Sequence, residues 1–577
     1  MRGPTKDLEL DSKALGAMPI VNRFLDKLHL EAFFEHYLPH KDPRSKLPAS
    51  LGLGLVLRNL IVAREPLYNL SEWATQFDEA LLGLRPGDSH LLTDDRIGRC
   101  LDQLFLADRA VLLTDIVVHA IKTFGLEMQE FHNDSTTITF SGRYRNGDGR
   151  PYKGRTTRRI VHGANKDHRF DLRQLLWVLT TTADGGVPIW CSVEHGNTED
   201  SSTHIDTWNL IRQLVGSSDF LYVADSKLCT KKNMAHIQQQ RGRFITILPK
   251  TRVEDRQFRD WLQTNKVSWT PLLCRKNVRQ QDGPDEIYKG FESTETSAEG
   301  YRIMWIWSSQ KATLDAEARE NRMERGIEGL RNLARRLLGP RPRMKSVARV
   351  EAAATKILEE TNAVRWLSFE VVQEEVQRFK QAKPGRPGKE TPYKRLTSSR
   401  PVLRWKPQAD AVQYDTLTDG IFPLILNDKT MSMKEALLAY KYQPTVEKRH
   451  EQLKTVLQVR PVLLKSPARI EAFLFMIFLA LLAQTLIERE LRRQMKTEKI
   501  DSLPLYPESR SCKQPTADRV FQLLELIRRH RLVGADGSLK KSFYDPLSST
   551  QRTVLRLLGL SPSAYFGDGD QREGHRG

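Results

Sequence analysis

Between residues 17 and 127 the apolar positions recur three or four residues apart, with short polar breaks between the runs. This is the periodicity of amphipathic helices, and it predicts helices at 21–30, 51–63, 68–77, 96–106 and 108–124. We therefore predict an all-helical N-terminal module over residues 1–127. Such a bundle serves either to bind DNA, as a helix-turn-helix reader does, or to form dimers, and periodicity does not separate the two.

At residue 128 the pattern changes to a period of two. Residues 128–141 predict a strand with Asp134 near its middle, and residues 220–225 predict a short apolar strand that ends in Asp225. Further strands are expected at 173–182, 187–195 and 243–249, with helices at 203–215 and 231–240. The resulting order, β-β-β-α-β-α-β, is that of an α/β RNase H-like fold, a mixed sheet with helices on both faces.

This order is interrupted after residue 250. We predict that residues 128–250 form the first part of the core, that 251–419 form an insertion domain and that 420–495 complete the core. Within the insertion, residues 377–408 hold ten Lys/Arg and one acid and are predicted to be a basic linker. Residues 496–577 are predicted to be a C-terminal helical region, with helices at 517–530 and 550–558.

The charge balance indicates the kind of partner. The chain of 577 residues has 90 Lys/Arg against 71 Asp/Glu, a net charge of +19, which favours a polyanion: DNA, RNA or a membrane surface. The most apolar run, 472–483, is shorter than the roughly 20 residues that cross a bilayer, so we predict a buried helix and no membrane association. No secretory signal is evident at residues 1–16, which favours an intracellular protein. The five cysteines are scattered and indicate neither a disulfide framework nor a zinc site.

A helix is predicted around Glu447, with Pro444 near its first turn. In an RNase H-like sheet Asp134 and Asp225 lie side by side, because the first and fourth strands are neighbours, and Glu447 would supply a third carboxylate. Three such groups repel one another unless cations lie between them, and two divalent metal ions would create a site that cleaves phosphodiesters. Oxygen ligands favour Mg²⁺, with Mn²⁺ as a substitute.

The spacing Tyr440-x2-Gln443-x3-Glu447-x6-Lys454 resembles the Y-x2-R-x3-E-x6-K signature of DDE transposases of the insertion-sequence type, with glutamine in place of arginine. The same resemblance extends over 132–134 (HND), 162–172 (HGANKDHRFDL), 195–200 (HGNTED), 223–226 (VADS) and 244–250 (FITILPK). It implies that Asp134, Asp225 and Glu447 are the catalytic, metal-binding residues of an enzyme that cuts the ends of a mobile element and joins them to target DNA. The phosphate contact that the family's arginine makes is not implied for Gln443.

Other residues are candidates for DNA binding. Tyr440 and Lys454 belong to the signature, and Lys454 is predicted to contact a substrate phosphate. Arg386 lies in a PGRP stretch that resembles a minor-groove hook, although a solvated linker is the alternative. Trp305 and Trp307 alternate on one strand; one of them stacks on a flipped base at the element's end, as in similar enzymes, or both belong to the core.

The expected partners are double-stranded DNA, both the terminal inverted repeats and the target, and a second copy of the chain in a homodimer on DNA. The expected location is the prokaryotic cytoplasm, in association with the nucleoid. Two other functions stay open at this point. One is a DNA-binding protein that descends from a transposase and has lost catalysis, and the other is an RNase H-like metal-dependent nuclease.

Overall fold

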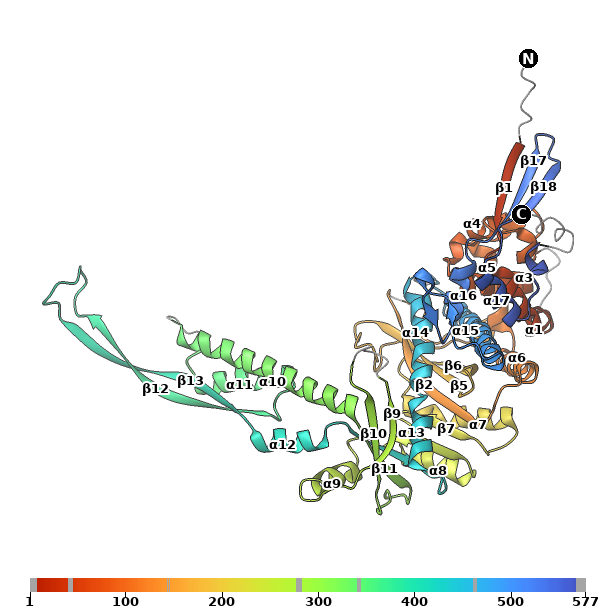
Figure 1. Cartoon of the computed structure of the whole chain (residues 1–577). Helices are drawn as coiled ribbons and strands as arrows, with labels where there is room; N and C mark the ends of the chain where they lie inside the picture. The colour runs from red at the N-terminus through yellow and green to blue at the C-terminus, as the bar shows by residue number, and fades with distance from the viewer. Residues whose placement is uncertain are drawn as a thin grey trace. The chain divides into compact units, whose positions relative to one another are not determined.

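The computed structural model describes residues 8–566 apart from 40–44, 143, 145, 277–282, 340–343 and 460–463. The chain divides into two compact units (Figure 1). Unit 1 comprises Met1–Thr246 and Leu438–Gly577, and unit 2 comprises Ile247–Leu437.

Unit 1 contains the predicted α/β core. Its strands lie in the order β6-β5-β2-β7-β8, in which β2 is antiparallel to β5 and parallel to β7. The strands span β2 (Glu130–Phe140), β5 (Arg173–Thr182), β6 (Pro188–Glu194), β7 (Leu221–Ala224) and β8 (Arg243–Ile247), with helices α7 (His204–Val215) and α8 (Lys231–Gln239) between them in the chain. Three consecutive antiparallel strands followed by parallel ones confirm the RNase H-like fold.

Helix α15 (Pro467–Thr497) forms the centre of unit 1. It is long and apolar enough to cross a membrane by length and composition, but its apolar window is entirely buried in the protein. It packs against the N-terminal helices α3 (Ala49–Val62) and α5 (Asp94–Leu106) and against strand β6. Arg469 on α15 binds the carboxylate of Asp102 on α5 through two hydrogen bonds of 2.9 and 2.8 Å. The prediction of a buried helix over 472–483 is confirmed.

The N-terminal region is helical, as predicted, with one exception. Its helices are α1 (Met18–Lys27), α2 (Leu30–Tyr37), α3, α4 (Leu70–Thr75), α5 and α6 (Arg109–Phe124). The side chains of Thr93 and Asp108 cap α5 and α6, and Gly125, in the left-handed conformation, ends α6. The exception is strand β1 (Leu8–Ala14), so the prediction of an all-helical module is wrong at this element.

Strand β1 belongs to a three-stranded sheet with the C-terminal strands β17 (Arg528–Gly534) and β18 (Leu539–Tyr544) (Figure 1). The helix predicted over 517–530 is therefore too long, because α16 (Ala517–Leu524) ends before β17 begins. Helix α17 (Ser549–Leu557) lies close to its predicted range. Local periodicity misses this sheet because its central pairing joins segments from the two ends of the chain.

Unit 2 has an antiparallel sheet and a long hairpin. The sheet strands lie in the order β14 (Ile421–Leu426), β11 (Arg302–Ser308), β10 (Glu286–Glu292) and β9 (Thr270–Arg275). The helices are α9 (Val253–Trp261), α10 (Ser309–Leu338), α11 (Val347–Glu360) and α12 (Ala409–Thr418). Strands β12 (Leu367–Gln381) and β13 (Tyr393–Pro407) form the hairpin, with fifteen residues of each strand in register. The prediction of an irregular basic linker at 377–408 is wrong, since most of that segment is paired strand.

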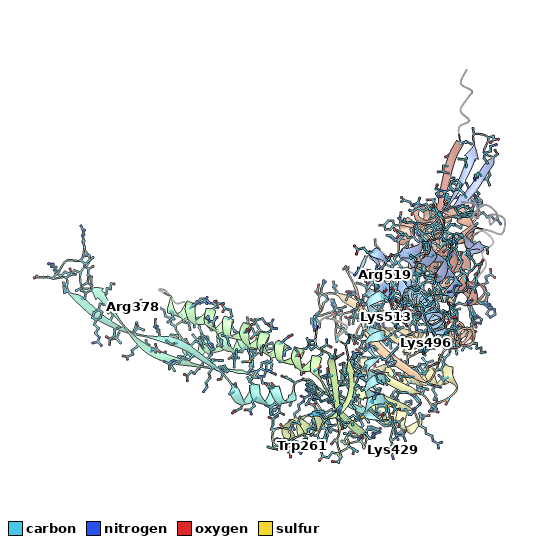
Figure 2. All side chains as sticks on the ribbon, viewed as in Figure 1. Trp261, Arg378, Lys429, Lys496, Lys513 and Arg519 are labelled. Atoms are coloured by element: carbon cyan, nitrogen blue, oxygen red, sulfur yellow. The ribbon has the colours of Figure 1, made fainter. Side chains whose placement is uncertain are left out.

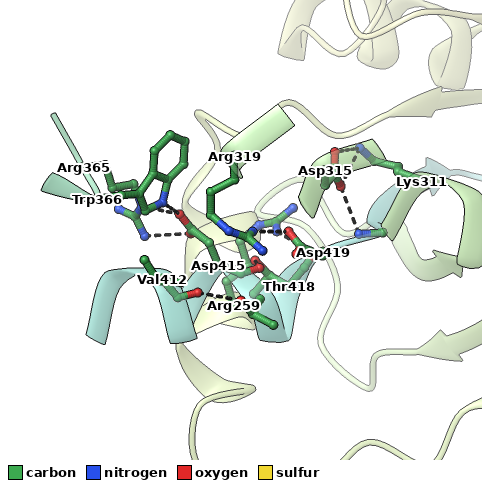
Figure 3. Close-up of polar contacts among 12 residues, drawn as sticks. Arg259, Lys311, Asp315, Arg319, Arg365, Trp366, Val412, Asp415, Thr418 and Asp419 are labelled. Atoms are coloured by element: carbon green, nitrogen blue, oxygen red, sulfur yellow. Dashed lines mark hydrogen bonds and ion pairs between the residues drawn. The ribbon is translucent and has the colours of Figure 1, made fainter. Parts of the chain in front are cut away.

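Polar contacts fix the base of this hairpin (Figure 3). Asp415 on α12 accepts hydrogen bonds from Arg365 Nε at 2.7 Å and Trp366 Nε1 at 2.6 Å, just before β12 begins. Arg319 on α10 donates to Asp419 at 2.8 Å, and both side chains are largely buried. Contacts with α12, and of α10 with Asp419 just after α12, therefore hold the base of the hairpin in place.

Candidate active site

Two of the three predicted catalytic acids lie side by side. In the parallel pairing of β2 with β7, Asn133 is the partner of Ala224, so the next residues, Asp134 and Asp225, emerge at the same edge. Burial raises the pKa of Asp134, and burial together with the charge of Asp134 raises the pKa of Asp225. The two carboxylates therefore repel each other across the strand boundary, which favours a cation between them.

Lys166 supplies a positive charge at this edge. Its Nζ lies 3.5 Å from Asp134 Oδ1 and 3.1 Å from Asp200 Oδ2, and it donates hydrogen bonds to the Ser135 hydroxyl at 2.9 Å and to the Ser135 carbonyl. Asp134, Asp200 and Asp225 together raise the pKa of Lys166, which keeps the ammonium charged. The sequence stretches 162–172 and 195–200 drew attention to these segments, but no role was predicted for Lys166 or Asp200.

The third predicted acid, Glu447, follows the insertion in the sequence. Helix α13 (Met433–Lys441) carries Tyr440, and α14 (Pro444–Val459) carries Glu447 in its first turn. Burial and the charges of Asp225, Glu447 and Asp134 raise the pKa of the Tyr440 phenol. Tyr440 is therefore within electrostatic reach of all three acids, while the Glu447 side chain is exposed.

Two further residues of α14 face the same edge. His450 is buried, with Nε2 at 3.6 Å from Asp134 Oδ2, and burial lowers its pKa to about 3, so the imidazole is neutral. Neither of its ring nitrogens has a hydrogen-bond partner within the described residues. Lys454 Nζ binds both carboxylate oxygens of Asp167, at 2.5 and 2.7 Å. This ion pair ties α14 to the loop that carries Lys166.

A comparison with protein families shows the family to which the chain belongs. A family model described as "Transposase DDE domain" matches residues 128–483, more than half of the chain. The chain belongs to the DDE transposase family. A second model, described as "Domain of unknown function (DUF4277)", matches residues 10–118 of the transposase. No curated protein matches the chain.

The donor atoms of the transposase suit a hard divalent cation, which the family generally uses. Asp134 and Asp225 offer carboxylate oxygens, and burial together with repulsion between the two carboxylates raises their pKa values even though Lys166 lies beside Asp134. Across the part of the chain that the structure describes, however, no three His, Cys, Asp or Glu side chains are grouped closely enough to hold a metal. The two aspartates fit a metal site in kind and position, and completion of a three-carboxylate site requires Glu447 to come closer.

Gln443, the departure from the family signature, has a structural role. Its Nε2 donates to the Asn133 carbonyl at 2.8 Å, and its Oε1 lies 3.1 Å from His132 Nδ1. Gln443 and His132 are both buried. The amide therefore joins the start of α14 to strand β2 directly beside Asp134, and its polar atoms are used within the protein.

Gln443→Ala is expected to lower the free energy of unfolding by about 1–3 kcal/mol, because it leaves the buried Asn133 carbonyl and His132 without these partners. Urea unfolding of the variant checks this expectation. Lys448→Ala, at an exposed position of α14, serves as the control and should change stability by no more than about 0.5 kcal/mol. Equal effects of the two substitutions would contradict the role of Gln443.

The tryptophans and Arg386 lie in unit 2. Trp305 is 1 % exposed and stacks on Phe258, with ring centroids 3.7 Å apart, so the structure supports the alternative that it belongs to the core. Trp307 is half-buried, with Lys289 Nζ 5.1 Å from its ring centroid. Trp261, which the sequence did not single out, is 40 % exposed (Figure 2). Arg386 is exposed at the turn between β12 and β13.

Proposed function

We propose that this chain is an insertion-sequence transposase that cleaves the ends of its element and joins them to target DNA, with Mg²⁺ as the cofactor. The observation that carries the proposal is the pair of half-buried, mutually repelling carboxylates of Asp134 and Asp225, which follow directly on the pairing of two neighbouring parallel strands. The proposed partners are the terminal repeats and the target DNA, and a homodimer is proposed for the DNA complex.

Each residue has a distinct part in this proposal. Asp134, Asp225 and Glu447 would hold the metal, which when bound supplies nucleophile activation and stabilises the leaving oxygen. The Lys166 ammonium, held by Asp200 and Ser135 beside Asp134, is placed to attract the scissile phosphate. Tyr440 adds a phenol donor next to the acids. Lys454, now bound to Asp167, would contact phosphate when DNA displaces that partner.

End recognition is proposed for the N-terminal helices within the whole chain. These helices pack on α15, and strand β1 pairs with β17. A fragment of residues 1–127 lacks both α15 and β17, so it would expose the apolar surfaces of its own helices that pack on α15 in the full chain. Tests of end binding therefore need the full chain.

The proposed function is tested with DNA that contains the coding sequence and its native flanks. We expect the chain to release 3′-hydroxyl ends at the element boundaries in Mg²⁺ and to join them to a target plasmid. A chelator should slow cleavage by a factor on the order of a hundred or more, because both activation and leaving-group stabilisation depend on the cation. Duplex binding should persist in the chelator.

The outcomes separate the rival functions. Cleavage without joining would indicate a metal-dependent nuclease. Binding without cleavage in either Mg²⁺ or Mn²⁺ would indicate a DNA-binding protein that has lost catalysis. Cleavage at full rate in the chelator would contradict the metal-dependent mechanism.

A further inference from the structure

The β12–β13 hairpin has two halves of different charge. The proximal half comprises residues 367–376 and 398–407, and the distal half comprises residues 377–397, including the turn; the register pairs Val376 with Ser398 and Gln377 with Thr397 at the boundary. The proximal half has three Lys/Arg and three Glu, whereas the distal half has seven Lys/Arg and one Glu. The positive charge is therefore concentrated at the turn end of the hairpin, away from its base at Leu367 and Pro407.

Contacts within the chain occupy the proximal half. Leu367 and Leu403 are buried in a cluster with residues of α10 and α11, such as Leu330 and Leu358. Arg404 donates to Glu374 across the strands at 2.9 Å. Hydrophobic packing and the Arg404–Glu374 ion pair therefore attach this half of the hairpin to unit 2 and join its two strands.

The distal half is exposed. All seven of its Lys/Arg side chains are exposed, and within the described residues none of them forms an ion pair: Arg378 (labelled in Figure 2), Lys380, Lys383, Arg386, Lys389, Lys394 and Arg395. Phe379 is 67 % exposed and Tyr393 is 53 % exposed. The ion pairs and buried contacts described for unit 2 therefore do not explain these seven cations and two aromatic rings.

The turn is closed rather than open. Ala382 N–H donates to the Pro392 carbonyl at 2.8 Å, which continues the strand pairing by one step. Gly388 N–H donates to the Thr391 hydroxyl at 2.7 Å, and Thr391 N–H donates to the Gly388 carbonyl at 3.1 Å. The distal half is thus a two-stranded ribbon with an ordered end.

The dimensions and charge of this ribbon suit duplex DNA. Paired strands lie about 4.8 Å apart, and the major groove, about 12 Å wide, admits a two-stranded ribbon. Residues opposite each other in register share a face, which places Arg378, Lys380 and Lys394 together on one face, while Arg395 lies on the other beside Phe379. Cations on both faces can contact the phosphates on both sides of a groove. A second copy of a chain with net charge +19 would be repelled.

We propose that the distal half of the β12–β13 hairpin is a DNA-binding arm that lies in the major groove of duplex DNA. The proposal rests on the proposed function, since it assigns part of the transposase's DNA affinity to this surface. The arm contains none of the proposed catalytic acids, so we assign it a part in holding DNA and not in the chemistry.

The test compares two triple variants of the full chain. The arm variant is Arg378→Gln, Lys380→Gln and Lys394→Gln. The control variant is Arg400→Gln, Arg404→Gln and Lys406→Gln, which removes three charges from the same face of the same hairpin, in the half that contains three glutamates. Binding to a duplex of arbitrary sequence is measured as a function of salt, with melting temperatures to verify folding.

Each phosphate contact contributes about 0.9 to the log–log salt slope on B-DNA, so the arm variant should lose between about two and three units of slope. The control should lose less than about one unit. Equal losses in both variants, or an unchanged slope in the arm variant, would overturn the arm. A change of oligomeric state in sedimentation, with duplex binding intact, would show that the surface binds a second copy and would also overturn it. Failure of the proposed function would differ from these results, because the wild-type protein would then bind DNA without cleaving it.

Discussion

Asp134→Asn is expected to reduce DNA cleavage by on the order of a thousandfold or more while DNA binding persists. The amide has the shape of the carboxylate but lacks the charge that would hold a cation between β2 and β7, where Asp225 is the neighbouring acid. Loss of the cation removes nucleophile activation and leaving-group stabilisation together. The cationic arm and Lys166 are unchanged, so the affinity for duplex DNA should stay the same or rise slightly as repulsion of phosphate falls.

Single-turnover cleavage and equilibrium binding, measured on the same duplex, test this expectation. Asp171→Asn is the matched control, because Asp171 is an exposed acid of the nearby loop whose side chain pairs with Arg169. Asp225→Asn and Glu447→Gln should behave as Asp134→Asn does. Full activity of Glu447→Gln would remove Glu447 from the proposed metal ligands, and parallel losses of binding and cleavage would indicate a structural defect instead.

The second large effect is expected at Arg449, two residues beyond Glu447. Its guanidinium binds Glu488 on α15 at 2.9 Å and the carbonyls of Gly185 and Gly186 at 3.2 Å each. The side chains of Arg449 and Glu488 are 6 % and 1 % exposed. Without Arg449, Glu488 keeps only the longer contact with Arg492, at 3.6 Å, and the hydrogen bond from the Ala517 N–H. Because the pair is buried, Arg449→Ala should lower the free energy of unfolding by about 3 kcal/mol, the lower end of the range for a broken buried pair.

Denaturant unfolding of the wild type and the variant checks this effect. Arg404→Ala is the control, because its ion pair with Glu374 is exposed, and such pairs contribute about 0–1 kcal/mol. If Arg449→Ala were as stable as Arg404→Ala, the buried pair would not be what holds α14 against α15. Cleavage should also fall in Arg449→Ala, since α14 carries Glu447.

Elements with strong local periodicity were predictable from the sequence. Strand β2, strand β7 and the apolar part of α15 have continuous patterns, and the order of the core strands placed Asp134 beside Asp225. The β12–β13 hairpin was mistaken for a linker because its many cations and the Lys383–Lys389 turn residues dominated the pattern. A turn between two alternating segments predicts a hairpin, but apolar and polar residues alternate strictly only over short stretches, at 367–371 (LSFEV) of β12 and at 403–406 (LRWK) of β13.

Contacts between distant segments were not predictable. Lys166, Asp200 and His450 are far apart in sequence, and only the fold brings them to Asp134. Nothing in the local sequence indicates that Arg449 is buried, because its partner Glu488 lies on α15, beyond the next loop. The role of Gln443 likewise depends on its burial against β2, which a spacing rule does not contain.

The sheet of β1, β17 and β18 also determines when the protein can finish folding during its synthesis. Leu8–Ala14 is synthesised about 520 residues before its partner, Arg528–Gly534. At 5–20 residues per second, roughly 25–100 s separate the two. The nascent N-terminal helices lack α15 until residue 497 is made, and they lack the sheet for the whole interval. A chain that stops before residue 528 never acquires β17. Completion of the N-terminal region therefore requires translation to have passed Gly534.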